Sequence, residues 1–171
     1  PGLSANEIAA IIGDYDGLAI RSATKVTGDL LSAATKLKVV GRAGIGVDNV
    51  DIAAATARGV VVMNTPYGNA VTTAEHAITM MLTLARQIPL ANTSTQAGKW
   101  EKSRFLGTEI TGKTLGVIGC GNIGSIVADR ARGLRMKVIG FDPFMTPEHA
   151  REKGIEKVDL DELLANADFI S

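Results

Sequence analysis

The sequence predicts an α/β protein built from two doubly wound parallel-sheet domains, both of which we expect to be incomplete in this chain of 171 residues. Short apolar runs alternate with helical stretches twice along the chain, once before residue 66 and again after residue 112. Such alternation implies parallel strands joined by right-handed crossovers. A Gly-x-Gly-x-x-Gly spacing stands inside the second series. We therefore expect one domain at residues 1–66 and a second at residues 67–171.

Composition and charge restrict the class of protein. Hydrophobic residues make up 46% and charged residues 21% of the chain, which is typical of a soluble globular protein. Lys plus Arg and Asp plus Glu are equal at 18 each, so no net charge favours nucleic acid or a membrane surface. No apolar run approaches the about 20 residues of a membrane helix. The single cysteine, Cys120, favours a reducing, cytoplasmic compartment, and we expect no metal site.

Three strands and two helices are expected in the first series. The apolar runs that predict strands are residues 17–20, 37–41 and 60–63. Helical stretches lie between them, at about 27–36 and at 52–58. Asp51 is suited to cap the N-terminus of the second helix, and Gly59 to end it.

A long helix is predicted next. Thr72 and Glu75 have the spacing of a capping box. Apolar residues then recur at helical spacing as far as Ile88, and Pro89 marks the expected end of the helix. Residues 92–112 are polar and are expected to be irregular.

The second series begins with a strand at 114–118 and continues in the same alternation. The further elements expected are a helix at about 122–132, a strand at 137–142, a helix opening at Thr146 and Pro147, a helix at 159–166 and the start of a strand within 167–171.

The glycines Gly119, Gly121 and Gly124 lie between the first strand and the first helix of this series. The first permits a tight turn, the second lets a pyrophosphate approach the backbone, and the third lets the helix pack close to the strand. Asp142 closes the next strand, where a carboxylate can accept hydrogen bonds from ribose hydroxyls. No arginine follows it, so we expect NAD rather than NADP. The alternative is a glycine-rich turn without a ligand.

Residues 107–114, GTEITGKT, match the phosphate-binding pattern of nucleoside triphosphatases letter for letter. That loop must follow a strand and open a helix, so that its N–H groups converge on phosphate. Here Gly-Lys-Thr opens a predicted strand instead. We expect this match to be a coincidence.

Polar and glycine residues follow the strands of the first series. Arg21 and Ser22 follow the first strand, and Arg42 with a glycine loop follows the second. The carboxyl ends of parallel strands share one edge, where ligands of open α/β sheets bind. Guanidinium groups bind phosphate and carboxylate in a bidentate manner. We expect a small anionic substrate here, although solvated surface charges are the alternative.

Several motifs resemble the D-2-hydroxyacid dehydrogenase family: IRSATKVT, VVGRAGIGVDNVD, VMNTPYGN, GKWEKSRFLGTEITGKTLGVIGCGNIG and FDP. The resemblance runs from about residue 15 to the end of the chain. It implies a flavodoxin-like substrate domain followed by a Rossmann NAD-binding domain, with a crevice between them. It also implies oxidation of 3-phospho-D-glycerate to 3-phosphohydroxypyruvate, the entry step of serine synthesis.

The resemblance also implies roles for individual residues. Arg21, Ser22 and Arg42 would hold the phosphate side of the substrate. The backbone of Ala43, Gly44 and Ile45 would hold its carboxylate, with Ile45 also beside the nicotinamide. Gly119, Gly121, Asn122, Ile123, Gly124 and Asp142 would bind NAD. The family's dimer contact includes the helix after NTPYGN and the GKWEKSRF loop, so we expect a homodimer or higher oligomer in which Lys102 or Arg104 reaches a neighbouring subunit.

No catalytic residue is expected in this chain. The family uses a His, a Glu and an Arg that would lie downstream of Ser171, and neither His76 nor His149 matches those motifs. We therefore expect this fragment to be inactive by itself. Two alternatives stay open: another D-2-hydroxyacid dehydrogenase that acts on glyoxylate or hydroxypyruvate, and a non-catalytic NAD-sensing protein like the corepressors that share this fold.

Overall fold

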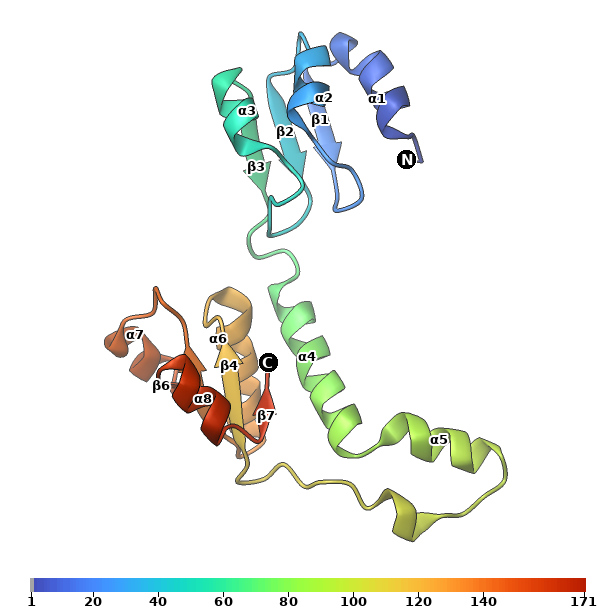
Figure 1. Cartoon of the computed structure of the whole chain (residues 1–171), viewed down its shortest axis with the longest axis vertical. Helices are drawn as coiled ribbons and strands as arrows, with labels where there is room; N and C mark the ends of the chain where they lie inside the picture. The colour runs from blue at the N-terminus through green and yellow to red at the C-terminus, as the bar shows by residue number, and fades with distance from the viewer. Residues whose placement is uncertain (1) are drawn as a thin grey trace. The chain divides into compact units, whose positions relative to one another are not determined.

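The computed structural model describes residues 2–171 and divides into two compact units, which meet in the chain at Asn69 and Ala70 (Figure 1). Each unit has its own parallel sheet and its own hydrophobic core. The α/β class and the parallel sheets predicted from the sequence are therefore confirmed.

The first unit contains a three-stranded sheet in the order β1-β2-β3. Its strands are β1 (Gly17–Ile20), β2 (Val39–Arg42) and β3 (Val61–Asn64), all parallel. The register pairs Ile20 with Arg42, and Arg42 with Asn64. The last residues of the three strands consequently lie side by side along one edge of the sheet.

The helices of this unit are short and begin at polar caps. They are α1 (Ala5–Ile11) with the 3₁₀ turn η1 (Ile12–Asp14), α2 (Gly28–Ala33) and α3 (Ile52–Ala57). Thr27 caps α2 by accepting from the N–H of Leu30, and Asp51 caps α3 as expected by accepting from the N–H of Ala54. A capping box of Ser4 and Glu7 begins α1, a helix that is not among those expected from the sequence.

The core of the first unit lies between these helices and one face of the sheet. Leu31 and Val40 are fully buried there, and Ile20 and Val26 are nearly so. The opposite face of the sheet is open within the described residues, where Val61 is 58% exposed. In this unit, the described helices therefore cover one face of the sheet only.

The second unit contains a four-stranded sheet in the order β6-β5-β4-β7. The strands are β4 (Thr114–Ile118), β5 (Lys137–Phe141), β6 (Glu156–Lys157) and β7 (Phe169–Ile170), again all parallel. The chain runs outward from β4 through β5 to β6 and then returns to the other side of β4. This reversal makes the carboxyl end of β4 the switch point of the sheet, which is where ligands bind in such folds.

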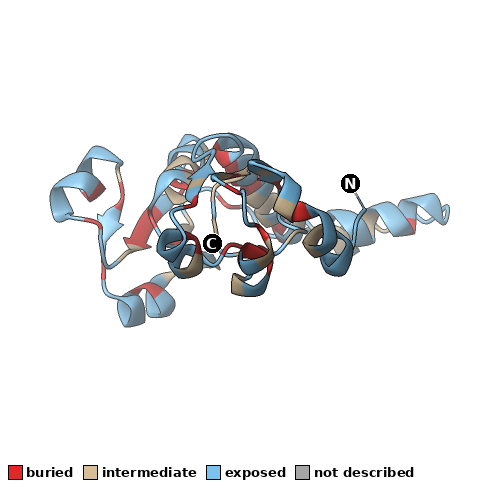
Figure 2. Cartoon of the chain, turned by 90° about the horizontal axis from the view of Figure 1, so that it is seen from above, coloured by how far each residue is buried: buried red, intermediate tan, exposed pale blue. Residues whose placement is uncertain are grey.

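Helices cover both faces of this second sheet, as expected for a doubly wound domain. The helices are α4 (Ala70–Ala85), α6 (Asn122–Gly133), α7 (Pro147–Glu152) and α8 (Leu160–Asn166). The main core packs α4 and α6 against β4, while Leu163 of α8 is fully buried against Ile139 on the other face. Figure 2 shows the buried residues in red on strands and inner helix faces.

Two sequence-based expectations for the long helix are wrong. Helix α4 begins at Ala70, so Thr72 lies inside it rather than at its cap. Pro89 does not end the helix either. A break at Gln87, whose φ is 55°, separates α4 from a further helix, α5 (Ile88–Gln96), and Pro89 stands in the first turn of α5. Part of the segment expected to be irregular is therefore helical.

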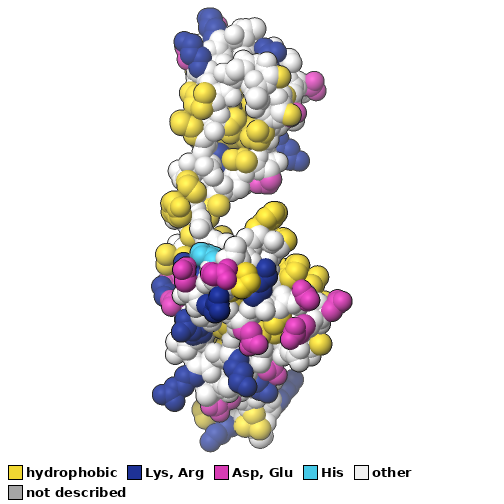
Figure 3. Space-filling model, turned by 90° about the vertical axis from the view of Figure 1, so that its left-hand side faces the viewer, with side chains coloured by type: hydrophobic (Ala, Val, Ile, Leu, Met, Phe, Trp, Pro, Cys, Tyr) yellow, Lys and Arg dark blue, Asp and Glu magenta, His cyan; other side chains and the backbone are white. Residues whose placement is uncertain are grey.

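The structure contains no helix within residues 2–171 that is long and apolar enough to cross a bilayer. On the face shown in Figure 3, acidic and basic side chains are intermixed over the second unit.

Candidate functional site

The glycine loop joins β4 to α6 at the switch point of the second sheet. Gly119 has a φ of +88°, a left-handed conformation that side chains disfavour. Its N–H donates to the carbonyl of Phe141 at the end of β5 (2.9 Å). The turn is thereby fixed against the neighbouring strand, and Gly121 becomes the residue before the first helical position of α6.

The other two glycines of the loop, Gly121 and Gly124, differ in the space around them. A Cβ atom built on Gly124 would collide with the carbonyl oxygen of Gly119, which is backbone and cannot yield. A Cβ atom on Gly121 would meet nothing within 4 Å. Gly124 is therefore required for the close packing of α6 on β4, whereas Gly121 leaves an open approach to the backbone. This is the division of roles that a pyrophosphate site needs.

Asn122 and Ile123 begin α6 directly beside that open approach. The first N–H groups of a helix have no intrahelical acceptor, and the helix dipole favours an anion in front of them. Asn122 is exposed, while Ile123 packs its side chain against the core. The backbone of these two residues is thus presented to a ligand by a helix that the core holds in place.

Asp142 follows β5 and lies next to the same loop. Its Oδ2 accepts from the N–H of Cys120 (2.9 Å), and its Oδ1 accepts from the N–H of Phe144 (2.8 Å). These two hydrogen bonds hold the pKa of the Asp142 carboxyl below its ordinary value of 3.8, and the one from Phe144 has the larger effect. The group is therefore a fixed carboxylate with lone pairs left to accept from hydroxyl groups. The residues present fit the adenosine and pyrophosphate portions of a dinucleotide.

Cys120 lies within the loop, but its side chain belongs to the core. The residue is 3% exposed, and its thiol donates to the carbonyl of Val117 at 3.6 Å. Burial, assisted by the charge of Asp142, raises the pKa of the thiol to about 11. A thiolate nucleophile is thus disfavoured, in agreement with a packing role.

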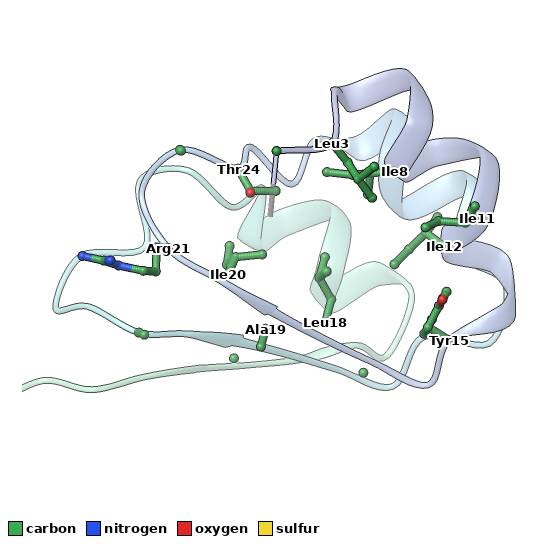
Figure 4. A pocket seen from close by; sticks show the side chains of 15 residues that line it. Leu3, Ile8, Ile11, Ile12, Tyr15, Leu18, Ala19, Ile20, Arg21 and Thr24 are labelled. Carbon is green, nitrogen blue, oxygen red and sulfur yellow. The ribbon is translucent and has the colours of Figure 1, made fainter.

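The strand-end residues of the first unit form a second candidate site, which we call the rim: residues 21–22, 42–45 and 64–65. The register of the sheet places the three segments at one edge. Figure 4 shows the side chain of Arg21 projecting from the end of β1, away from the apolar side chains of α1. Those side chains, together with β1 and with Arg21 and Ala43 of the rim, line a hollow of about 710 Å³ that is mainly apolar.

Arg42 is not a solvated surface charge. Its side chain is only 11% exposed and lies over the glycine loop, since a Cβ on Gly44 would meet its Nη1 at 2.5 Å. Its Nη2 is 3.8 Å from Asp48, which is itself 85% exposed. The Nε atom is buried and has no hydrogen-bond partner among residues 2–171. The guanidinium is therefore held in place, and its Nε–H group is left free to donate a hydrogen bond to a ligand.

The glycine loop of the rim is fixed by hydrogen bonds to neighbouring strand ends. Asn64 donates its side-chain amide to the carbonyl of Ile45 (2.7 Å), and the N–H of Thr65 donates to the carbonyl of Gly44 (3.0 Å). The N–H groups of Ala43 and Gly44 donate to backbone carbonyls. In the described part of the chain, the N–H groups of Ile45 and Gly46 have no such acceptor, so this loop can offer them to a carboxylate.

The rim also contains a contact that the sequence analysis missed. The side-chain amide of Asn49 donates to the carbonyls of Arg21 (2.9 Å) and Thr24 (2.6 Å), so it joins the loop after β1 to the loop after β2. The only available signal was a polar pair, Asp48 and Asn49, between the glycine loop and the cap of α3. Such a pair is too common to indicate a long-range contact.

The remaining candidates lie elsewhere on the second unit. His76 is exposed on α4, and His149 on α7 lies 3.7 Å from Glu152. Lys102 and Arg104 belong to a 3₁₀ turn, η2 (Lys102–Phe105), in which Arg104 pairs with Glu101.

The triphosphatase-like match does not form a phosphate loop. Thr114 is the first residue of β4, and Lys113 forms an ion pair with Asp168 at 3.5 Å. No group of three or more His, Cys, Asp or Glu residues is arranged to bind a metal anywhere in residues 2–171.

Replacement of the two glycines by alanine should separate binding from folding. Gly121→Ala should leave the free energy of unfolding within about 0.5 kcal/mol of the parent. It should weaken NADH binding about tenfold or more, because the methyl group occupies the approach to the backbone. Gly124→Ala should instead destabilise the unit by about 1–3 kcal/mol. Urea unfolding and fluorescence titration with NADH measure the two effects, and undiminished NADH affinity in Gly121→Ala would contradict the site.

The carboxylate of Asp142 should make stability depend on pH. A pKa lower in the folded than in the unfolded chain stabilises the fold above the unfolded value, and that stabilisation disappears as pH falls through the folded value. Between about pH 5 and pH 3, the free energy of unfolding should therefore fall less steeply in Asp142→Asn than in the parent. Asp161→Asn, on an exposed aspartate of α8, is the control. Equal slopes in the parent and in Asp142→Asn would show that the two amide contacts are not formed.

Comparison with known proteins agrees with this geometry. Residues 78–171 match the family described as D-isomer specific 2-hydroxyacid dehydrogenase, NAD binding domain. The chain is 52% identical over 170 residues to a D-3-phosphoglycerate dehydrogenase of Synechocystis, and 49% identical to one of Archaeoglobus fulgidus. These alignments cover 99% of this chain but 31% and 32% of the relatives, so the chain spans about a third of their length.

A solved structure with a similar fold is D-lactate dehydrogenase from Aquifex aeolicus, complexed with NAD and lactic acid. It superposes with a TM-score of 0.87 at 30% identity, over 95% of this chain and 49% of that one. The sheet order, the glycine loop with its carboxylate and the family match over more than half of the residues lead to one conclusion. The chain belongs to the D-isomer-specific 2-hydroxyacid dehydrogenase family, whose NAD-binding domain residues 78–171 match.

Proposed function

We propose that this chain is the substrate- and NAD-binding part of an enzyme that oxidises 3-phospho-D-glycerate to 3-phosphohydroxypyruvate, the first step of L-serine biosynthesis. Residues 1–66 form the substrate-binding domain and residues 67–171 the NAD-binding domain. The observation that carries the proposal is the pair of guanidinium groups at one sheet edge, Arg21 exposed and Arg42 held over the glycine loop. The identity of about half to proteins named for this activity supports it.

Different residues of the rim bind different parts of this substrate in the proposal. Arg21, Ser22 and Arg42 bind the phosphate side, since a guanidinium matches a phosphate with parallel N–H donors. The backbone of Ala43, Gly44 and Ile45 faces the carboxylate, with Ile45 providing a free donor. Ile45 also lies beside the nicotinamide in this proposal.

In the reaction, a secondary alcohol becomes a ketone, and its hydroxyl proton passes to a base. NAD, when bound, accepts the two electrons and the hydrogen of the C–H bond. The proposed contribution of this chain is to position both reactants. Neither histidine lies at the glycine loop or at the rim, so we expect the chain to bind and not to catalyse turnover. The cytoplasm suits its single cysteine, whose thiol is free and buried.

Arg21→Ala should weaken the binding of 3-phospho-D-glycerate about tenfold or more, because a charge-assisted contact to the phosphate is lost. Binding of D-glycerate, which has no phosphate, should change by less than about twofold. Calorimetric titration of the full chain with both compounds measures this difference. Arg58→Ala, at the end of α3, is the matched control.

The substrate class can be contradicted in two ways. If Arg21→Ala binds 3-phospho-D-glycerate as tightly as the parent, Arg21 does not bind the phosphate. If glyoxylate or hydroxypyruvate binds the parent more tightly than 3-phospho-D-glycerate, the chain belongs to a different member of the same family.

We propose that the enzyme is a homodimer formed through α4, α5 and the segment that follows. Large apolar side chains are exposed there to an extent that suits an interface. They are Met80 (55%), Leu84 (74%), Ile88 (52%), Leu90 (61%), Trp100 (84%) and Leu106 (71%). Lys102 and Arg104 lie in this segment and would reach the neighbouring subunit.

Sedimentation should therefore give a dimer for the parent chain, and Leu84→Glu should shift it to a monomer, because a charge in an apolar interface is costly to bury. Leu164→Glu provides the control, since Leu164 is also exposed (52%) but lies on α8. A parent chain that stays monomeric at high concentration would contradict the interface.

A further inference from the structure

The side chain of Asn49 makes two long-range hydrogen bonds that have no place in the substrate contacts proposed above. Its Nδ2 donates to the carbonyl of Arg21 at 2.9 Å and to that of Thr24 at 2.6 Å. Asn49 is half-buried, and its Oδ1 is buried without a partner in residues 2–171. Because both contacts are to carbonyl oxygens, only the NH₂ group of the amide can occupy this position.

The loop that Asn49 holds is otherwise weakly tied. Both hydrogen bonds that the structure, over residues 2–171, gives to residues 21–25 come from this one amide. The loop contains Arg21, whose side chain is exposed and has no ion-pair partner in the described chain. The position of its backbone therefore depends on Asn49 rather than on contacts of the arginine itself.

The backbone of Asn49 itself is held by contacts to its neighbours. Asn49 follows the glycine loop over which Arg42 lies, and its own carbonyl accepts from the N–H of Val26 (2.8 Å). Val26 and Val50 form an isolated parallel bridge, and both are buried. Asn49 thus joins the loop that carries the exposed Arg21 to the loop that carries the enclosed Arg42. Its own backbone is held by the adjacent bridge between Val26 and Val50.

We infer that Asn49 is a positioning residue that fixes the backbone of the Arg21 loop relative to the loop that carries Arg42, and so makes the rim selective for a phosphorylated substrate. The inference rests on the proposed function, since it assigns Asn49 an effect only through Arg21. An anion that contacts both arginines gains most when the two loops are held in place before binding, because no loop has to be ordered on association.

Asn49→Asp is the sharpest change, since it keeps the shape of the side chain. It replaces the NH₂ donors with a carboxylate oxygen that faces two carbonyl oxygens, so both contacts are lost and the loop is repelled. The Val26–Val50 bridge uses backbone groups only and is retained, so the variant should fold. Asn166→Asp is the matched control, because the Asn166 amide donates to a carbonyl within α8 of the other unit.

The test is a double-mutant cycle between Asn49→Asp and Arg21→Ala in the full chain, read by the affinities for 3-phospho-D-glycerate and for NADH. Asn49→Asp should weaken 3-phospho-D-glycerate binding about tenfold when Arg21 is present. It should have less than about a twofold further effect in the Arg21→Ala background. NADH affinity should be unchanged throughout, and Asn166→Asp should change neither affinity.

The possible failures are distinct. An equal loss in both backgrounds would mean that Asn49 acts on the general stability of the unit, and it would overturn the inference. So would unchanged affinity in Asn49→Asp when Arg21→Ala is impaired, and the proposed function would then survive. Absence of 3-phospho-D-glycerate binding in the parent chain would remove the proposed function together with this inference.

Discussion

The packing of α6 against β4 at Gly124 determines what the second unit can bind. No side chain can be accommodated there, because the carbonyl of Gly119 occupies the space. The helix is therefore brought directly onto the strand end, and its first N–H groups point out of the switch point of the sheet. Gly121 leaves that position open, and Asp142 stands beside it, held by two backbone amides. Cofactor binding thus depends on a steric requirement set by the core.

In the first unit, the corresponding constraint is the register of three parallel strands. It aligns the last residues of β1, β2 and β3, and it brings loops from distant parts of the sequence together. Two asparagine amides then connect these loops, Asn49 to the Arg21 loop and Asn64 to the Ile45 carbonyl. One arginine is enclosed and the other exposed, so a ligand would meet one fixed and one adjustable charge.

Much of the fold could be predicted because it depends on local patterns. Apolar runs, the Asp51 cap and the glycine spacing each report on a few neighbouring residues, and the structure confirms the elements they predict. The break at Gln87 could not be predicted, since a glutamine in a left-handed conformation has no sequence signal and Pro89 is equally compatible with a helix end and a helix start. Thr72 was misleading for a similar reason, because α4 had already begun.

In the candidate sites, too, some residues could be predicted from local patterns and other features could not. The residues of the glycine loop follow from spacing, and the arginines follow from strand ends. The contacts of Asn49 join groups 28 and 25 positions apart in the chain, and no local pattern indicates them or the enclosed state of Arg42. Side-chain hydrogen bonds between loops are set by tertiary packing, so they become visible only when the strands are aligned.

We propose that two separate anion-binding sites lie in this chain, one for the dinucleotide and one for the substrate. The direct test is ¹⁵N chemical-shift mapping of the full chain, titrated first with NADH and then with 3-phospho-D-glycerate. We expect NADH to shift the amide signals of residues 119–124 and 142–144, and the substrate to shift those of residues 21–22 and 42–45. Shifts from NADH that avoid the glycine loop, or from the substrate that avoid the rim, would contradict it.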